Sequence, residues 1–234
     1  LCLSLQVVAF EVQQIYLFYF LISSLFVQSL AMISLWPTNQ IIKHAHLWQN
    51  LRDIVASQPQ ILQFIEIMIL ADLMQYSFHR LFHQIPFLWK FHAVHHSARV
   101  MDWMAGSRMH IFEIIALRAV TIIPLYALGF STFTLYIYIF FVYLVSTWVH
   151  ANVRFNDEWL AKYFVTPRFH HWHHGIESEA IDVNFAVHFP WIDKIFGTHY
   201  LPKNEWPSGY GIQNHPVPNG YLKQFMYPFK NTKE

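Results

Sequence analysis

The sequence predicts an all-α integral membrane protein, a bundle of about four membrane helices with a histidine-rich cap on the cytoplasmic side. Three observations predict this class. First, 55% of the 234 residues are hydrophobic, only 12% are charged, and the mean hydropathy is +0.27. Second, the hydrophobic residues form runs long enough to cross a bilayer. Third, there are 16 histidines, and most of them are clustered near the ends of those runs. A soluble domain of this composition would have too few polar side chains to cover its surface.

The expected membrane helices differ in how many charges they contain. The first has no charge over 22 residues, which at about 1.5 Å per residue crosses a hydrocarbon core of roughly 30 Å. The second contains Glu66 and Asp72, and the third contains Glu113 and Arg118. The fourth follows the third directly, so these two are expected to form a helical hairpin. The four helices are expected at residues 15–36, 60–78, 111–130 and 131–149.

The distribution of Lys and Arg predicts which side of the membrane the histidines face. If all four helices cross, or if the last pair enters and returns, the segments after the second and fourth helices share one side. Residues 79–110 contain four Lys or Arg and residues 150–234 contain eight, whereas the opposite side would have only Lys43 and Arg52. Cytoplasmic segments of membrane proteins carry an excess of these residues. We therefore expect a multi-pass membrane protein whose histidine-bearing side is cytoplasmic.

The chain is expected to form a single domain, residues 1–234. It would consist of an N-terminal span and loop (1–59), a motif-bearing core (60–200) and a C-terminal tail (201–234). No internal repeat or Gly/Ser-rich linker divides these parts, and frequent prolines break regular helices in the region after Asn156. The chain from Asn156 onward is therefore expected to fold as a cap against the helix ends.

Charge and cysteine content exclude several kinds of partner and site. The formal net charge is +1, which is too small for a nucleic-acid-binding protein, because counterion release requires a clear excess of Lys and Arg. Cys2 is the single cysteine, so this chain alone cannot form a disulfide framework, a cysteine-ligated zinc site or an iron–sulfur cluster.

The spacing of the histidines predicts a site for two metal ions. His83 lies four positions after His79, so on a helix both imidazoles can bind one ion. The pattern H-x-x-H-H occurs at 92–96 and at 170–174. In this pattern the adjacent histidines diverge by roughly 100° around the helix axis, so each of them can serve a different ion. The predicted ligands are His79, His83, His92, His95, His96, His150, His170, His173 and His174.

Isolated histidines and the charge at Asp72 have alternative interpretations. A single histidine in an apolar chain is usually a hydrogen-bonded core or interface residue, and this is expected of His44, His46, His188, His199 and His215. Asp72 precedes His79 by seven residues and would share its face, so it is expected to accept an imidazole N–H just outside the ligand set. The alternative is that Asp72 is the partner of Arg80 or of another cation. The nearly all-nitrogen ligand set excludes Mg²⁺ and Ca²⁺ and favours iron with dioxygen chemistry, with zinc left open.

Several segments together resemble the sterol desaturase / fatty acid hydroxylase superfamily. They are "DLMQYSFHRLFH" (72–83), "LWKFHAVHHS" (88–97), "MDWMAGSRMHIFE" (101–113), "HANVRF" (150–155), "TPRFHHWHH" (166–174) and "WIDKIFGTHY" (191–200). The resemblance implies a helical membrane enzyme with a non-haem di-iron centre on the cytoplasmic side. Such an enzyme uses dioxygen and external electrons to hydroxylate or desaturate a lipid. The same nine histidines would be the iron ligands.

Three positions depart from the pattern of that superfamily. Where its members often have R-x-H-P-x-E, this chain has Ile111 after His110, and His110 is a candidate additional ligand. His171 falls at a variable position of its motif and is not a predicted ligand. A frequent D-x-N-Y-G stretch is represented here by residues 182–186, in which Asn184 is expected to support the ligands from outside the ligand set.

The resemblance and the missing motifs together define the expected partners. No G-x-G-x-x-G precedes a helix and no H-P-G-G occurs, so the electrons would come from a separate protein such as cytochrome b5, a ferredoxin or a reductase. Basic side chains could bind an acidic carrier, although anionic lipid headgroups explain them equally well. A membrane metal transporter or storage protein and a zinc-dependent membrane hydrolase are the alternative functions. The sequence predicts no particular oligomeric state. The basic residues concerned are Arg99, Arg154, Arg168 and Lys194.

Overall fold

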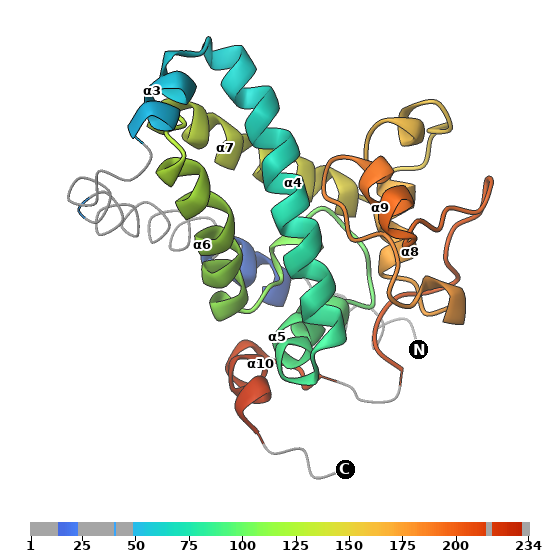
Figure 1. Ribbon diagram of the computed structural model, residues 1–234. Helices are drawn as coiled ribbons and strands as arrows, with labels where there is room; N and C mark the ends of the chain where they lie inside the picture. Colours follow the sequence, from blue (N-terminus) through green and yellow to red (C-terminus); the bar gives the residue numbers. More distant parts are fainter. Residues whose placement is uncertain (1–13, 23–39, 41–48, 214–216, 231–234) are drawn as a thin grey trace.

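The protein is described by a computed structural model in which residues 14–22, 40, 49–213 and 217–230 are placed (Figure 1). All regular structure in these residues is helical, apart from one isolated antiparallel bridge between Gly175 and Tyr210, which confirms the all-α prediction. The first expected membrane helix lies largely outside the described residues, and only a helix over 14–22 is seen there. The later helices are α3 (Gln49–Ser57), α4 (Gln60–Gln84), α5 (Pro86–His96), α6 (Ile111–Ala127), α7 (Thr132–His150), α8 (Pro167–His173), α9 (Pro190–Phe196) and α10 (Tyr221–Met226).

Helix α4 is the central element of the molecule. It runs along the length of the structure, with α6 and α7 beside it and the shorter helices α8 and α9 on its other side (Figure 1). One apolar core joins the first half of α4 to α6 and α7, through fully buried residues such as Ile67, Leu125 and Leu135. A second core joins the second half of α4 to α7, α8 and α9, through Phe169 and Ile192. The first half of α4 thus belongs to the bundle and its second half to the cap, which we define as residues 151–213.

Two described helices, α4 and α7, are long and apolar enough to cross a bilayer. The expected helix over 111–130 is shorter than predicted, because α6 ends after 17 residues at Ala127. Gly129 then adopts a φ of 101°, a backbone conformation that residues other than glycine rarely adopt. The hydroxyl of Ser131 caps α7 by accepting a hydrogen bond from the Thr134 amide. This local sequence makes the tight turn of the predicted hairpin.

Proline and cap residues fix the short helices that carry the histidines. Ile85 is extended, as residues before proline tend to be, and Pro86 occupies the first turn of α5, so the chain turns sharply after α4. Helix α8 begins in the same way, with Thr166 as its capping residue and Pro167 in its first turn. Both H-x-x-H-H motifs therefore lie on helices whose starting points are fixed by the sequence.

Candidate metal centre

The structure brings all nine predicted histidines together in two adjoining clusters. In each cluster one ligand nitrogen per residue lies within 4.8 Å of all the others. The clusters adjoin, because the rings of His96 and His174 stack with their centroids 4.3 Å apart. Cluster one contains His79 and His83 from α4, His92 and His96 from α5, and His173 from α8. Cluster two contains His95 from α5, His150 from α7, and His170 and His174 from α8 and its end.

The two H-x-x-H-H motifs divide between the clusters in the way that helical geometry predicts. His92 and His96 belong to cluster one, while His95 belongs to cluster two. In the second motif the first and last histidines belong to cluster two and His173 belongs to cluster one. Adjacent residues on a helix diverge by about 100°, so neighbouring imidazoles point toward different clusters.

The outer ring nitrogens of several histidines are fixed by oxygen acceptors. The Nδ1 atoms of His79 and His95 lie 2.9 and 3.3 Å from the carbonyl oxygens of Phe185 and Arg108. Those of His150 and His173 lie 2.7 Å from the carbonyl oxygens of Ser146 and Val183. A carbonyl can only accept, so in these neutral imidazoles the proton is on Nδ1 and Nε2 carries a free lone pair.

The inner nitrogens face one another at distances that suit ligands of a common ion. In cluster two the Nε2 atoms of His95 and His150 are 3.3 Å apart, and both lack a proton by the preceding argument. Two lone pairs at this distance repel, whereas a cation between them turns both into ligands. Metal–nitrogen bonds of about 2.0–2.1 Å place neighbouring ligands roughly 3 Å apart. In cluster one the Nε2 atoms of His79 and His92 are 3.0 Å apart. The donor set therefore fits two metal ions.

Burial keeps the histidines of α5 and α8 neutral. Removal from solvent lowers the pKa of His92, His95 and His96 well below 6.5, and the neighbouring imidazoles lower it further. The pKa values of His170, His173 and His174 are lowered for the same two reasons. An imidazole must be unprotonated to bind a metal, so this environment prepares the rings as ligands.

Two carboxylates lie directly behind the clusters, and neither was predicted as a site residue. Glu113 of α6 accepts a hydrogen bond from Nδ1 of His92, and both side chains are buried. Asp182 of the cap lies 3.1 Å from Nδ1 of His83. Carboxylates in this position fix the tautomer of a metal-binding histidine and raise its basicity. A signal for Glu113 was present in the sequence, since a carboxylate in an apolar run calls for a partner.

Asp72 differs from its prediction, because its hydrogen bonds run to the backbone and not to an imidazole. Its carboxylate accepts from the amides of Val187, His188 and Phe189 at 2.7 to 3.0 Å. Asp193 of α9 accepts hydrogen bonds from the amides of Phe185 and Ala186, which come directly before Val187 in the chain. Two buried carboxylates thus hold five successive amides of the segment 185–189. This segment includes the Phe185 carbonyl that orients His79, so Asp193 holds that residue directly and Asp72 holds only the residues that follow it.

The other expected supporting residue and the candidate tenth ligand also lie outside the clusters. The Asn184 side chain bonds to the carbonyls of Phe169 and Tyr200 and to the amide of Tyr200, and its φ is 59°. It therefore ties the cap loop to α8 without touching an imidazole. His110 caps α6 by accepting from the Phe112 amide, and its Nε2 bonds to the Phe225 carbonyl.

The remaining histidines of the described chain have structural roles. His171 lies between its motif neighbours, yet its Nδ1 lies 2.8 Å from the Tyr210 hydroxyl, away from both clusters. His188 is buried against Tyr138 and Phe141, as expected for a core histidine, and the partly exposed His199 packs on Phe169. His44, His46 and His215 lie outside the described residues.

Four basic residues of the cap and its surroundings were expected to be available to a carrier protein, and one of them is not. Arg168 is buried, with Nε 2.8 Å from the Asp157 carboxylate and Nη1 2.6 Å from the Pro202 carbonyl. Arg154 is exposed and lies over the Trp206 ring, 5.0 Å from its centre. Arg99 and Lys194 are exposed.

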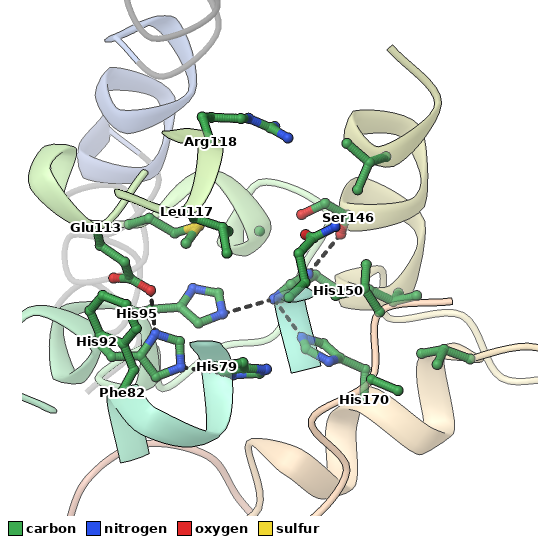
Figure 2. Close-up of a pocket in the computed structure, with 18 residues that line it drawn as sticks. His79, Phe82, His92, His95, Glu113, Leu117, Arg118, Ser146, His150 and His170 are labelled. Carbon is green, nitrogen blue, oxygen red and sulfur yellow. Dashed lines mark hydrogen bonds and ion pairs between the residues drawn. The ribbon is translucent and has the colours of Figure 1, made fainter. Parts of the chain in front are cut away.

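An apolar cavity of about 120 Å³ lies against the clusters on the side of α6 and α7. Figure 2 shows five imidazoles at one end of this cavity and Arg118 at the other. Both clusters contribute to its wall, which is otherwise mainly hydrophobic. The imidazoles are those of His79, His92, His95, His150 and His170, and the apolar lining includes Met109, Leu117, Val142, Val149 and Val165.

A second hollow, of about 620 Å³, lies against the other four imidazoles. It is formed by α5 and the cap, with Trp89, Ile176 and Asp182 in its wall. The two sets of histidines do not overlap, so the nine imidazoles together form the partition between an apolar cavity and a larger, more polar hollow. The four that face the second hollow are His83, His96, His173 and His174.

Comparisons with known proteins agree with this geometry. The fatty acid hydroxylase family matches residues 64–198, the part of the chain that holds both clusters. The chain is 30% identical over 194 residues to ornithine lipid hydroxylase OlsE of Rhizobium tropici, covering 82% of this chain and 56% of the relative. It is 28% identical over 179 residues to alkylglycerol monooxygenase of Homo sapiens and 26% over 172 residues to that of Caenorhabditis elegans. These matches cover 76% and 74% of this chain, and 39% and 34% of the relatives.

The chain spans little more than half the length of the first of these curated relatives and less than half of the other two. No solved structure matches it. The family match covers more than half of the chain and contains every histidine of the two clusters, as the motifs of the sequence indicated. This protein belongs to the fatty acid hydroxylase family, within the sterol desaturase / fatty acid hydroxylase superfamily.

Proposed function

We propose that this protein is a membrane-bound, dioxygen-dependent lipid hydroxylase or desaturase with two iron ions. The observation that carries the proposal is the pair of buried clusters whose unprotonated Nε2 atoms face one another beside an apolar cavity. The names of its relatives, a lipid hydroxylase and alkylglycerol monooxygenases, support an oxygenase acting on a lipid.

The proposed ligands of the first ion are the five histidines of cluster one, and those of the second ion are the four of cluster two. Iron is the metal that suits both an imidazole set and oxygen chemistry. The two ions would supply the binding and reduction of dioxygen. In hydroxylation, R–H, O2, two electrons and two protons give R–OH and water. In desaturation, the same reactants remove two hydrogens from adjacent carbons and give an alkene and two waters.

The residues of the chain have three tasks in this proposal. Backbone carbonyls and the carboxylates of Glu113 and Asp182 hold the imidazoles in one tautomer. The hydrophobic wall of the cavity takes up the hydrocarbon chain and keeps bulk water from the reacting carbon. The second hollow leaves the opposite face of the clusters open to small reactants and to electron delivery.

We also propose the membrane arrangement that the charge distribution predicts. The helices would form about four membrane spans, with α4 and α7 supported by length and composition, and the clusters would face the cytoplasm. Residues 1–234 would form one domain, with residues 1–59, 60–200 and 201–234 as its successive parts. The electrons would come from a separate carrier such as cytochrome b5, a ferredoxin or a reductase.

Metal analysis combined with isotope labelling tests the proposed function. The purified protein should contain about two iron ions per chain, and lipid from cells that express it should gain one ¹⁸O atom per hydroxylated molecule under ¹⁸O2. A desaturase would instead give a product two hydrogens lighter without label. Zinc as the bound metal with lipid turnover under anaerobic conditions would establish the hydrolase alternative. Metal flux into vesicles without lipid turnover would establish the transporter.

A further inference from the structure

Arg118 is the one cation among the residues that line the apolar cavity, and the proposed chemistry does not use it. It lies near the middle of α6, five residues after Glu113, or about 7.5 Å farther along the helix axis. Figure 2 shows its guanidinium group at the end of the cavity away from the imidazoles. Its Nε atom is buried and has no hydrogen-bond partner among the described residues.

Neither Glu113, which lines the cavity and whose Oε2 is buried without a partner, nor Asp72 pairs with Arg118 among the described residues. The other oxygen of Glu113, Oε1, accepts from His92. Asp72 of the neighbouring helix α4 is held by three backbone amides. Within the described part of the chain Arg118 therefore has no counter-ion.

Arg118 is partly buried, and its unpartnered Nε atom is unfavourable, because it has lost its hydration and gained no equivalent interaction. Its planar array of five N–H donors matches the oxygens of a carboxylate or a phosphate, which it can bind in a bidentate manner. An oxyanion carried by whatever fills the cavity would supply the missing partner. A purely hydrocarbon occupant would leave the charge unpaired.

We propose that Arg118 binds an oxyanion of the lipid substrate, a carboxylate or a phosphate, and so determines which carbon lies beside the clusters. The inference rests on the proposed function only in calling the occupant a substrate. With the oxyanion held at Arg118, the imidazoles at the opposite end of the cavity face carbons a fixed number of bonds away. Arg118 is thus a specificity-determining residue that recognises the polar group of the lipid.

Equilibrium binding to metal-free protein tests this assignment without using catalysis. The probes are radiolabelled oleate, oleyl phosphate and oleyl alcohol, with the protein in an uncharged detergent. Replacement of Arg118 by Met keeps the volume and removes the charge, and Arg118→Lys keeps the charge without the planar fork. We expect Arg118→Met to weaken binding of the preferred anion by about tenfold to a hundredfold and binding of the alcohol by less than about twofold. Arg118→Lys should lie between these limits.

The comparison of the two anions shows which oxyanion Arg118 binds. Weaker binding of oleate in Arg118→Met identifies a carboxylate-bearing lipid, and weaker binding of oleyl phosphate identifies a phosphate-bearing one. The matched control is Lys162→Met, which removes an exposed cation of the cap and should change neither affinity. Equal weakening of anion and alcohol, in a variant that melts at the wild-type temperature, would overturn the proposal by showing a role in cavity shape alone. No change for either anion would overturn it too. Neither result would bear on the iron content, so the proposed function is tested separately.

Discussion

His95 and His96 are neighbours in the chain and belong to different clusters. The Nε2 of His95 faces His150, whereas the Nε2 of His96 lies 3.0 Å from that of His173. One turn of α5 therefore supplies ligands to both proposed ions, and a change at either residue should act on one ion more than on the other.

Ligand deletions should separate the two ions. His96→Ala leaves four imidazoles in cluster one, and His170→Ala leaves three in cluster two. We expect His170→Ala to retain about one iron per chain and His96→Ala to bind the ion of cluster one more weakly, each with little remaining oxygenase activity because both ions take part in the proposed chemistry. Metal content by mass spectrometry checks this result. His171→Asn is the control from the same motif, since His171 bonds to Tyr210, and it should keep both ions. Two irons in His170→Ala would contradict the assignment of cluster two.

Removal of the carboxylate behind His92 should weaken metal binding without removing a ligand. Glu113→Ala deletes the acceptor that fixes the His92 tautomer, and we expect the iron affinity of cluster one to fall by about tenfold to a hundredfold. Glu113→Gln retains an acceptor oxygen without the charge and should lose less. Titration with a competing chelator measures the change. Unchanged retention of iron in both variants would show that Glu113 does not support the ligand.

A methyl group at Gly106 should disturb cluster two from behind. A Cβ atom there would lie 2.9 Å from both His150 Nδ1 and the Ser146 carbonyl oxygen, the two partners of the hydrogen bond that orients His150. The carbonyl belongs to α7 and cannot move freely, so Gly106→Ala should displace the imidazole and lower iron content. In Gly209→Ala the new Cβ would meet only the flexible side chain of Ile176, so that variant should behave as wild type.

Replacement of Asp72 should loosen the cap. Asp72→Asn removes the charge that three backbone amides share and brings an NH2 group against at least one of them, so the free energy of unfolding should fall by about 2–4 kcal/mol. Thermal unfolding of the purified protein measures it. Glu66→Gln removes a carboxylate from the same helix, where its partner is the Gln58 side chain, and should have little effect.

His188 should contribute to acid sensitivity. Burial lowers its pKa to about 4, so between pH 6.5 and 4 the unfolded chain binds a proton that the folded chain does not. The free energy of unfolding therefore falls as the pH falls through this window, by up to about 3 kcal/mol from this residue. His188→Gln can still accept from Tyr138 and lacks the titration, so its stability should depend less on pH. The metal-ligand histidines titrate in both proteins, so the difference between the two stability curves isolates His188. Parallel curves from pH 7 to pH 4.5 would contradict this account.

The sequence predicted the helical class and the grouping of the histidines because both follow from short-range spacing. On any α-helix, positions 92 and 96 lie near one face and position 95 is turned by about 100° from position 96, however the rest of the chain folds. The roles of Asp72 and Glu113 depend instead on which segments pack together. Asp72 meets amides more than a hundred positions later in the chain, and Glu113 meets His92 from another helix. The length of α6 depends on the turn at Gly129, which the hydrophobic run through residue 130 conceals.

The distribution of the proposed ligands along the chain would set the order in which the proposed metal centre can be assembled. Before α8 is synthesised and docked, cluster two has only the imidazoles of His95 and His150, while cluster one already has four. A nascent chain that ends before Pro167 can therefore hold at most one ion firmly. Loading of the proposed second ion would therefore report that α8 has docked against α5 and α7.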